Sequence, residues 1–170
     1  RQKQYDRAGA AFDEVAADPK GKFAKDAALA AAQAWELGSG GQRLVDACER
    51  FIARAPNDPL ATKMRRATAL RALEQLARQA EYATLEARAA AILRDATLVA
   101  DQGFAANVRD LKDGAAFKRI EAGDEGEAPR RFLSFAEENP KSKYAEVALH
   151  DAMVRAEAAS DAETALAAGE

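Results

Sequence analysis

The stretch 139-NPKSKYAEVA-148 decides the fold, because its spacing returns twice elsewhere in the chain. In this stretch a proline is followed after four residues by a large side chain and after five residues by an alanine. Given as proline, large residue and alanine, the three copies are Pro19, Phe23 and Ala24; Pro56, Leu60 and Ala61; Pro140, Tyr144 and Ala145. A spacing that recurs in this way is typical of repeat proteins, in which one structural unit stacks on the next.

Apolar residues precede each proline at helical spacing. Before Pro56 and Pro140 they fall at i, i+4 and i+7, which places them on one face of a helix. These stripes are Leu44, Cys48 and Phe51, then Ala128, Phe132 and Phe135, with a first copy of Ala8, Phe12 and Val15 that is one residue shorter before Pro19. A degenerate copy leads to Thr97 in place of a proline. Each step between copies is long enough for two helices, so the repeat unit is predicted to be a helix pair.

Glycine, proline and Asx residues separate the stripes and set the boundaries of the predicted helices. The helices are expected at residues 2–17, 22–38, 41–54, 58–79, 81–97, 101–121, 125–138, 142–159 and 161–168. Strand-favouring residues are scarce, whereas alanine, leucine and charged helix formers abound. Alanine at helix crossings lets two backbones approach closely. The sequence therefore predicts an all-α fold of about four helix pairs in a single domain over residues 1–170.

The best-formed copy resembles the tetratricopeptide repeat. Its features are the turn Gly123-Asp124, the stripe of Ala128, Phe132 and Phe135, and the following P-x-S-x-Y-A-x-x-A pattern from Pro140. The last pattern is similar to the longer repeat of bacterial envelope proteins. The resemblance implies a right-handed α–α superhelix, a role as a protein-binding scaffold, and a periplasmic or cell-envelope location. Without the resemblance, a cytoplasmic location would be the default.

The repeat register also bears on the two ends of the chain. Tyr5, Ala8 and Phe12 match the second helix of a repeat, and Ser160-Asp161 followed by Ala165 matches the start of another. We therefore expect the chain to be a fragment of a longer protein.

In the family that the chain resembles, the first helix of each pair lines the concave face, where partners bind. The resemblance transfers this role to nine positions, in three groups. They are Asp26, Gln33 and Glu36; Lys63, Arg66 and Leu70; and Val147, His150 and Val154. The degenerate third repeat matches too poorly to transfer any position. A groove of mixed charge with apolar strips would suit a peptide or a helical segment of a partner protein.

Composition and motifs argue against catalysis and against several classes of partner. The chain has one His and one Cys, and no phosphate-binding, dinucleotide-binding or zinc-protease motif. His150 is expected on the surface, and Cys48 is expected to be a small buried hydrophobe. We predict no enzyme activity, no cofactor and no metal site. The net charge is −3 and the basic block at residues 42–71 is local, so no nucleic-acid partner is expected. No apolar segment is long enough to span a membrane.

Two alternative functions remain open from the sequence. In the first, the chain self-associates through an unpaired repeat edge that includes Phe12 or Leu166. In the second, it is a helical accessory domain of an enzyme whose catalytic part lies outside residues 1–170.

Overall fold

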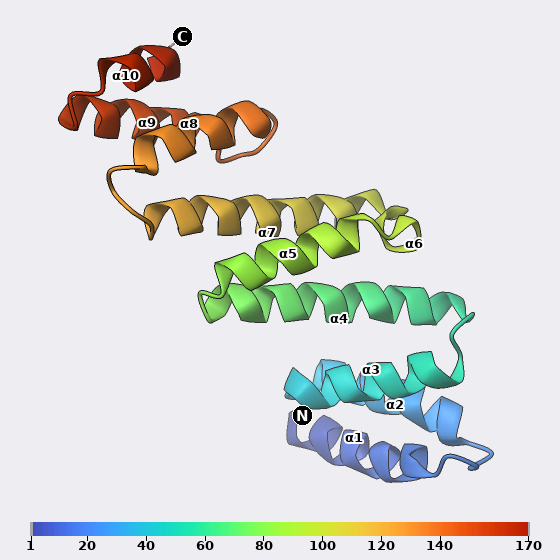
Figure 1. Cartoon of the computed structure of the whole chain (residues 1–170). Helices are drawn as coiled ribbons and strands as arrows, with labels where there is room; N and C mark the ends of the chain where they lie inside the picture. The colour runs from blue at the N-terminus through green and yellow to red at the C-terminus, as the bar shows by residue number, and fades with distance from the viewer. Residues whose placement is uncertain (1, 170) are drawn as a thin grey trace. The chain divides into compact units, whose positions relative to one another are not determined.

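The computed structural model describes residues 2–169, and all regular secondary structure in that range is helical (Figure 1). The prediction of an all-α fold is therefore confirmed for these residues. The helices are α1 (Gln2–Ala17), α2 (Ala24–Leu37), α3 (Gly41–Arg54), α4 (Pro59–Arg78), α5 (Tyr82–Leu93), α6 (Ala96–Val99), α7 (Gln102–Glu121), α8 (Ala128–Glu138), α9 (Ala145–Ala158) and α10 (Ala162–Gly169).

The chain divides into two compact units, Arg1–Ala69 and Leu70–Glu170. The first contains α1 to α3 and the start of α4, and the second contains the rest of α4 and α5 to α10. The regular superhelix and the single repeat domain over residues 1–170 stay predictions.

The three proline turns share one hydrogen-bond pattern, which confirms that the copies are aligned correctly. At Pro19 the amide of residue Pro+2 donates to the carbonyl of Pro−1, and the amide of Pro+5 donates to the carbonyl of Pro+2. The same two bonds occur at Pro56 and at Pro140, with N···O distances of 2.9–3.2 Å throughout. The alanine at Pro+5 is buried in every copy, with 2%, 0% and 8% exposure at Ala24, Ala61 and Ala145. The repeated spacing thus specifies both the turn and the first buried alanine of the next helix.

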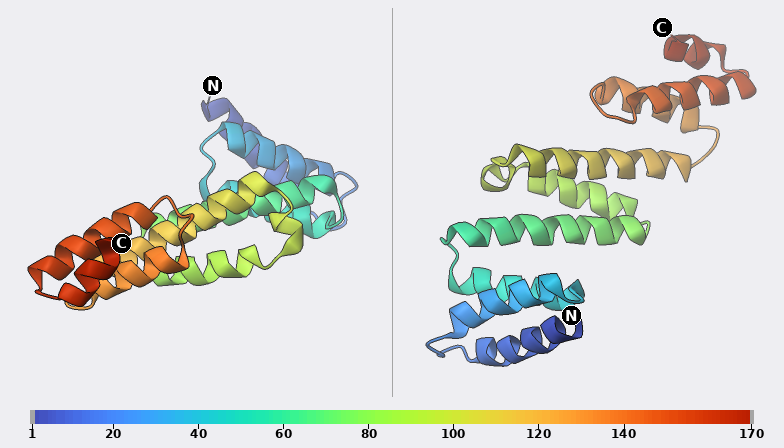
Figure 2. Two further views of the ribbon diagram at one scale, coloured as in Figure 1. Left: turned by 90° about the horizontal axis from the view of Figure 1, so that it is seen from above. Right: turned by 180° about the vertical axis from the view of Figure 1, so that it is seen from behind.

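The core of the first unit forms where α2 lies between α1 and α3 (Figure 2). Trp35 on α2 is 1% exposed and lies against Gly9 of α1, where an added Cβ would stand 2.6 Å from the ring. Its indole Nε1–H donates to Asp13 at 2.9 Å, and Asp13 also accepts from Arg50 of α3. Cys48 is 4% exposed and packs with Ala31, Ala32 and Trp35, which confirms that it is a small buried hydrophobe.

The predicted orientation of α1 is wrong. Phe12 and Val15, expected on the packed stripe, are 40% and 49% exposed, while Gly9 and Ala16 form the buried side of the helix. The first copy is one residue shorter before its proline, and one residue rotates a helix face by about 100°. In addition, only a residue as small as glycine fits beneath the ring of Trp35. The packed face of α1 is therefore its small-residue face.

The core of the second unit is most strongly aromatic around α7, α8 and α9. The Phe117 ring lies 5.1 Å from that of Phe132, 6.3 Å from that of Phe135 and 5.5 Å from that of Tyr144, measured between centroids. Phe132 is fully buried, and Ala148 on α9 is buried in the same cluster. Such offset and edge-on ring pairs are stabilising beyond the area that they bury.

In the degenerate repeat, two helices stand where the sequence predicted one helix over residues 81–97. Helix α5 ends at Leu93, and the short helix α6 starts after Asp95, whose carboxylate accepts from the amides of Thr97 and Leu98 at 2.9 and 3.2 Å. Asp101 caps α7 in the same way through the amide of Phe104. Aspartate at a helix N-cap satisfies amides that have no partner within the helix. The Asp95 cap divides the helix predicted at residues 81–97, whereas the Asp101 cap starts α7 close to the start predicted at residue 101.

Candidate protein-binding surfaces

The first group of predicted binding residues lies on the outer side of α2. The opposite side of this helix is its alanine-rich core face, with Ala27, Ala28 and Ala31 among its buried residues. Asp26, Gln33 and Glu36 are all exposed. Because residues seven apart share a helix face, Asp26 and Gln33 point in nearly the same direction. This strip is hydrophilic and carries two carboxylates.

The second group lies on α4 and is less accessible. Lys63 is exposed, whereas Arg66 and Leu70 are half-buried. In the first unit α4 packs on α2, since Ala61 belongs to the same core cluster as Ala27 and Ala28. Asp26 and Lys63 are thus exposed charges of opposite sign on two helices that share a core cluster.

An ion pair reinforces the packing of the α4 start against α2. Lys25 Nζ lies 3.2 Å from Asp58 Oδ2, and the amide of Leu60 donates to Asp58 Oδ1 at 3.0 Å. The backbone bond from Leu60 and then the Lys25 ammonium lower the pKa of Asp58 below its usual value. Asp58 therefore stays ionised near neutral pH, as a helix N-terminus favours.

The third group forms a compact strip on α9, in the second unit. Val147 and Val154 are 49% and 46% exposed, and His150 lies exposed between them. The other side of α9 is buried through Ala145, Ala148, Ala152 and Ala156. Two exposed β-branched side chains thus share a face with the single histidine, which has the surface position predicted for it.

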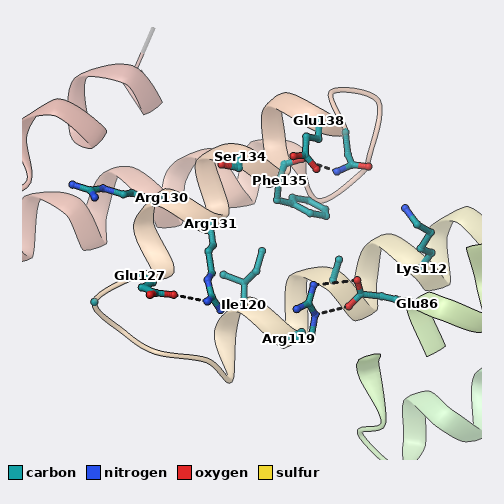
Figure 3. Close-up of a pocket in the computed structure, with 13 residues that line it drawn as sticks. Glu86, Lys112, Arg119, Ile120, Glu127, Arg130, Arg131, Ser134, Phe135 and Glu138 are labelled. Carbon is teal, nitrogen blue, oxygen red and sulfur yellow. Dashed lines mark hydrogen bonds and ion pairs between the residues drawn. The ribbon is translucent and has the colours of Figure 1, made fainter. Parts of the chain in front are cut away.

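The second unit also contains an open groove of about 600 Å³ that the sequence did not predict (Figure 3). It lies between α5, α7 and α8, with Ile120 and Phe135 as its main apolar lining. Its charged lining residues are Glu86, Lys112, Arg119, Glu127, Arg130, Arg131 and Glu138. The positive side chains outnumber the negative ones by one, in a chain whose net charge is negative.

Ion pairs within the protein engage three of the groove arginines. Arg119 binds both carboxylate oxygens of Glu86, at 2.7 and 3.3 Å, and Arg131 pairs with Glu127 (Figure 3). The Glu86 carboxylate raises the pKa of Arg119 above its usual value. Arg130 lies 3.3 Å from Asp161. The groove therefore presents neutralised pairs rather than the concentrated positive charge that a phosphate group needs.

The side chains that the structure describes form no metal-binding cluster. Ser142, the nearest serine before His150 in sequence, lies in the turn before α9, where its hydroxyl accepts from the amide of Tyr144 at 3.3 Å. Residues 2–169 contain no group of three His, Cys, Asp or Glu side chains that could hold a metal ion. In the same range, no helix is both long and apolar enough to cross a membrane.

The groove residues illustrate what apolar periodicity misses. Glu86 and Arg119 are 33 residues apart, as are Lys25 and Asp58, and as are Asp110 and Lys143, whose charged atoms lie 2.9 Å apart. A separation of 33 residues is about one helix pair, so each ion pair joins a helix to the helix, or to the turn before the helix, about one repeat further along. Opposite charges at this separation are a sequence signal that could have identified these contacts.

Comparison of the chain with protein families, with curated proteins and with solved structures gives no match. Functional inference therefore depends on the surfaces themselves.

Proposed function

We propose that the chain is a non-catalytic scaffold that binds a peptide or a helical segment of another protein. The binding surface is the exposed face of the first helix in each helix pair. The observation that carries the proposal is the strip of Val147, His150 and Val154 on α9. Exposed apolar side chains that share one face of a well-packed helix favour a protein-binding surface more than singly scattered ones do. The resemblance of residues 123–150 to the tetratricopeptide repeat supports the same assignment.

The strip suits a short apolar segment with a polar residue at its centre. Val147 and Val154 are separated by two helical turns, about 10 Å along the axis, which matches the distance between apolar anchors on an amphipathic helix. The imidazole of His150 lies between them and can donate or accept a hydrogen bond to the partner.

The surface in the first unit would select a partner segment by charge. Asp26 and Glu36 on α2 and Lys63 on α4 are all exposed, so a segment with both signs of charge would be complementary. Exposed charges of this kind contribute more to orientation and to association rate than to affinity. A location in the bacterial cell envelope is part of the proposal, and it rests on the repeat resemblance alone.

A displayed library of helical peptides, selected on the purified chain, tests the proposal. Peptides selected on the wild type should bind at least tenfold more weakly to a double variant with Val147→Asp and Val154→Asp. The matched control is Leu166→Asp, which introduces a carboxylate at a residue that is 71% exposed on α10. A selection that yields no binder, or binders that tolerate the double substitution, would argue against this surface.

A further inference from the structure

The groove of the second unit has two helical walls. The wall on α7 is one helix face with the spacing i, i+4 and i+7, formed by Lys112, Ala116 and Arg119. The wall on α8 is a face with the spacing i, i+3 and i+7, formed by Arg131, Ser134 and Glu138. Described helices precede α5 and follow α8, so the groove belongs to the interior of the described sequence and not to either end of it.

Each wall carries one charge that no ion pair neutralises within residues 2–169. On α7 the guanidinium of Arg119 is engaged by Glu86, whereas Lys112 forms no ion pair in this range although its side chain is half-buried. On α8 the arginines are engaged by the ion pairs described above, whereas the exposed carboxylate of Glu138 forms none among the same residues. The α7 wall therefore offers a free cation, and the α8 wall offers a free carboxylate.

These two free charges lie at the same end of the groove. The turn at residues 122–127 reverses the chain, so that α8 runs back along α7 (Figure 1). A residue early in α7 therefore lies toward a residue late in α8, and Figure 3 shows Lys112 and Glu138 toward one end and Glu127 toward the other. A segment bound there would meet a cation on one side and a carboxylate on the other.

The floor of the groove is apolar and shallow. Ile120 and Phe135 are 9% and 5% exposed, and the groove volume of about 600 Å³ is in the usual range for binding sites. The walls are helices, whose backbone groups bond within the helix, so they offer no strand edge to an extended peptide. An amphipathic helix satisfies its own backbone groups and presents an apolar face between two charged flanks. It is the peptide form that these walls suit.

We propose that this groove binds an amphipathic helix of a partner protein whose two flanks carry opposite charges. The apolar face of the helix lies on Ile120 and Phe135, its acidic flank faces Lys112 and its basic flank faces Glu138. A helix with two basic flanks would bring a cation to Lys112, and a helix with two acidic flanks would bring a carboxylate to Glu138. Both arrangements are repulsive. The groove shares no lining residue with the strip on α9, so this binding site does not depend on that one.

Three synthetic helical peptides with the same apolar face test the charge preference by fluorescence anisotropy. One has lysine on both flanks, one has glutamate on both, and one has glutamate on one flank and lysine on the other. The wild type should bind the mixed peptide about fivefold more tightly than either of the others, as expected for exposed ion pairs. Lys112→Glu should transfer the preference to the lysine peptide, and Glu138→Lys should transfer it to the glutamate peptide.

The matched control is Arg88→Glu, which makes the same change of charge at an exposed residue of α5 that does not line the groove. This variant should keep the wild-type order of the three peptides. The helical circular dichroism of all variants should be unchanged, because neither Lys112 nor Glu138 holds an ion pair among the described residues. Absence of binding by every peptide, or an order that Lys112→Glu and Arg88→Glu change equally, would overturn the proposal.

Methyl NMR locates the bound peptide. The chain has three isoleucines, of which Ile120 lines the groove and Ile52 belongs to the first unit. The mixed peptide should shift the Ile120 δ-methyl signal and leave that of Ile52 in place. A peptide that binds without shifting Ile120, or whose binding is lost only in the Val147→Asp and Val154→Asp double variant, would belong to the strip on α9 and would overturn the groove assignment.

Discussion

The two units use the same repeat spacing but stabilise their cores by different interactions. In the first unit one large ring, Trp35, lies on the backbone at Gly9 and is held by the carboxylate of Asp13. In the second unit Phe117 packs against three other aromatic rings, among them that of Phe132. The first core depends on the close approach of a ring to the backbone of α1 and on a side-chain hydrogen bond, whereas the second core depends on the packing of aromatic rings against one another. The repeat thus specifies where a side chain lies, and the local residues decide what holds it there.

This difference predicts different sensitivities. A hydrogen bond between side chains is directional, and removing one partner leaves a buried donor without its acceptor. Trp35 makes such a hydrogen bond to Asp13, and Arg50 donates to the same carboxylate. The Nε of Arg50 is also buried, with no acceptor among the described residues. Ring packing has no such requirement, but it loses stability in proportion to the volume removed.

Removal of an aromatic ring should cause the largest loss. Phe132→Ala should lower the unfolding free energy of the second unit by about 3–5 kcal/mol, since the side chain is fully buried and leaves a cavity beside Phe117. Urea unfolding followed by far-UV circular dichroism measures the change. Phe23→Ala, at a residue that is 62% exposed, should change the midpoint very little. Equal shifts for the two variants would contradict the ring-based core.

Enlargement of a repeat alanine should cost somewhat less. Ala145, at the start of α9, is 8% exposed, and a tryptophan there would overpack the crossing by about 1–3 kcal/mol or more. Ala167 lies exposed on α10, so Ala167→Trp should be tolerated. Thermal unfolding of both variants gives the comparison. Similar losses would mean that the register derived from the three prolines is wrong for α9.

The two glycines under aromatic rings compare the units directly. Glycine to alanine normally stabilises a helix interior by about 0.5–1 kcal/mol. At Gly9 the new Cβ would stand 2.6 Å from the ring of Trp35, which is buried and tied to Asp13, so we expect a loss of about 1–3 kcal/mol. At Gly114 the new Cβ would stand 2.9 Å from the Tyr144 hydroxyl oxygen and 3.2 and 3.3 Å from two of its ring carbons, so this half-buried ring must shift by a few tenths of an ångström against Phe117.

Gly114→Ala should therefore cost less than Gly9→Ala. Trp35 is the single tryptophan, so its fluorescence reports the Gly9→Ala variant selectively, while circular dichroism reports both. A stabilising Gly9→Ala would mean that the Trp35 ring is free to move, and the proposed contrast between the two cores would fail.

The repeated prolines allowed the turns and the buried alanines to be predicted, because steric constraints around proline and small residues at helix crossings are local effects. The orientation of α1 could not be predicted in this way. It depends on the contact between Gly9 and Trp35, which are far apart in sequence, and on the one-residue difference before Pro19. The groove pair of Glu86 and Arg119 was missed for a related reason, since apolar periodicity carries no information about which charges meet. The division of the helix predicted at residues 81–97 was missed because apolar spacing carries no information about a side-chain cap such as that of Asp95.

The smallest expected effect concerns the turns within the helix pairs, and here the second unit is the less well optimised of the two. In the first unit the turn between α2 and α3 uses Gly40, with φ 63° and ψ −117°, a conformation that essentially only glycine adopts. In the second unit Ala80 stands between α4 and α5 with φ 56°, where its Cβ is strained.

Ala80→Gly should therefore raise the unfolding free energy by about 0.5–1 kcal/mol. This net gain is the strain that is relieved in the folded state, minus the cost of the larger backbone entropy that glycine has in the unfolded chain. Ser160, with φ 59° between α9 and α10, provides a second test of the same effect. Gly40→Ala should act in the opposite sense and by a larger amount, because no relaxed conformation is open to alanine at that turn. Denaturant midpoints of the three variants measure these changes. If Ala80→Gly destabilised the chain, Ala80 would have to hold the turn through packing of its methyl group, and the turns of the two units would then differ in kind rather than in residue choice.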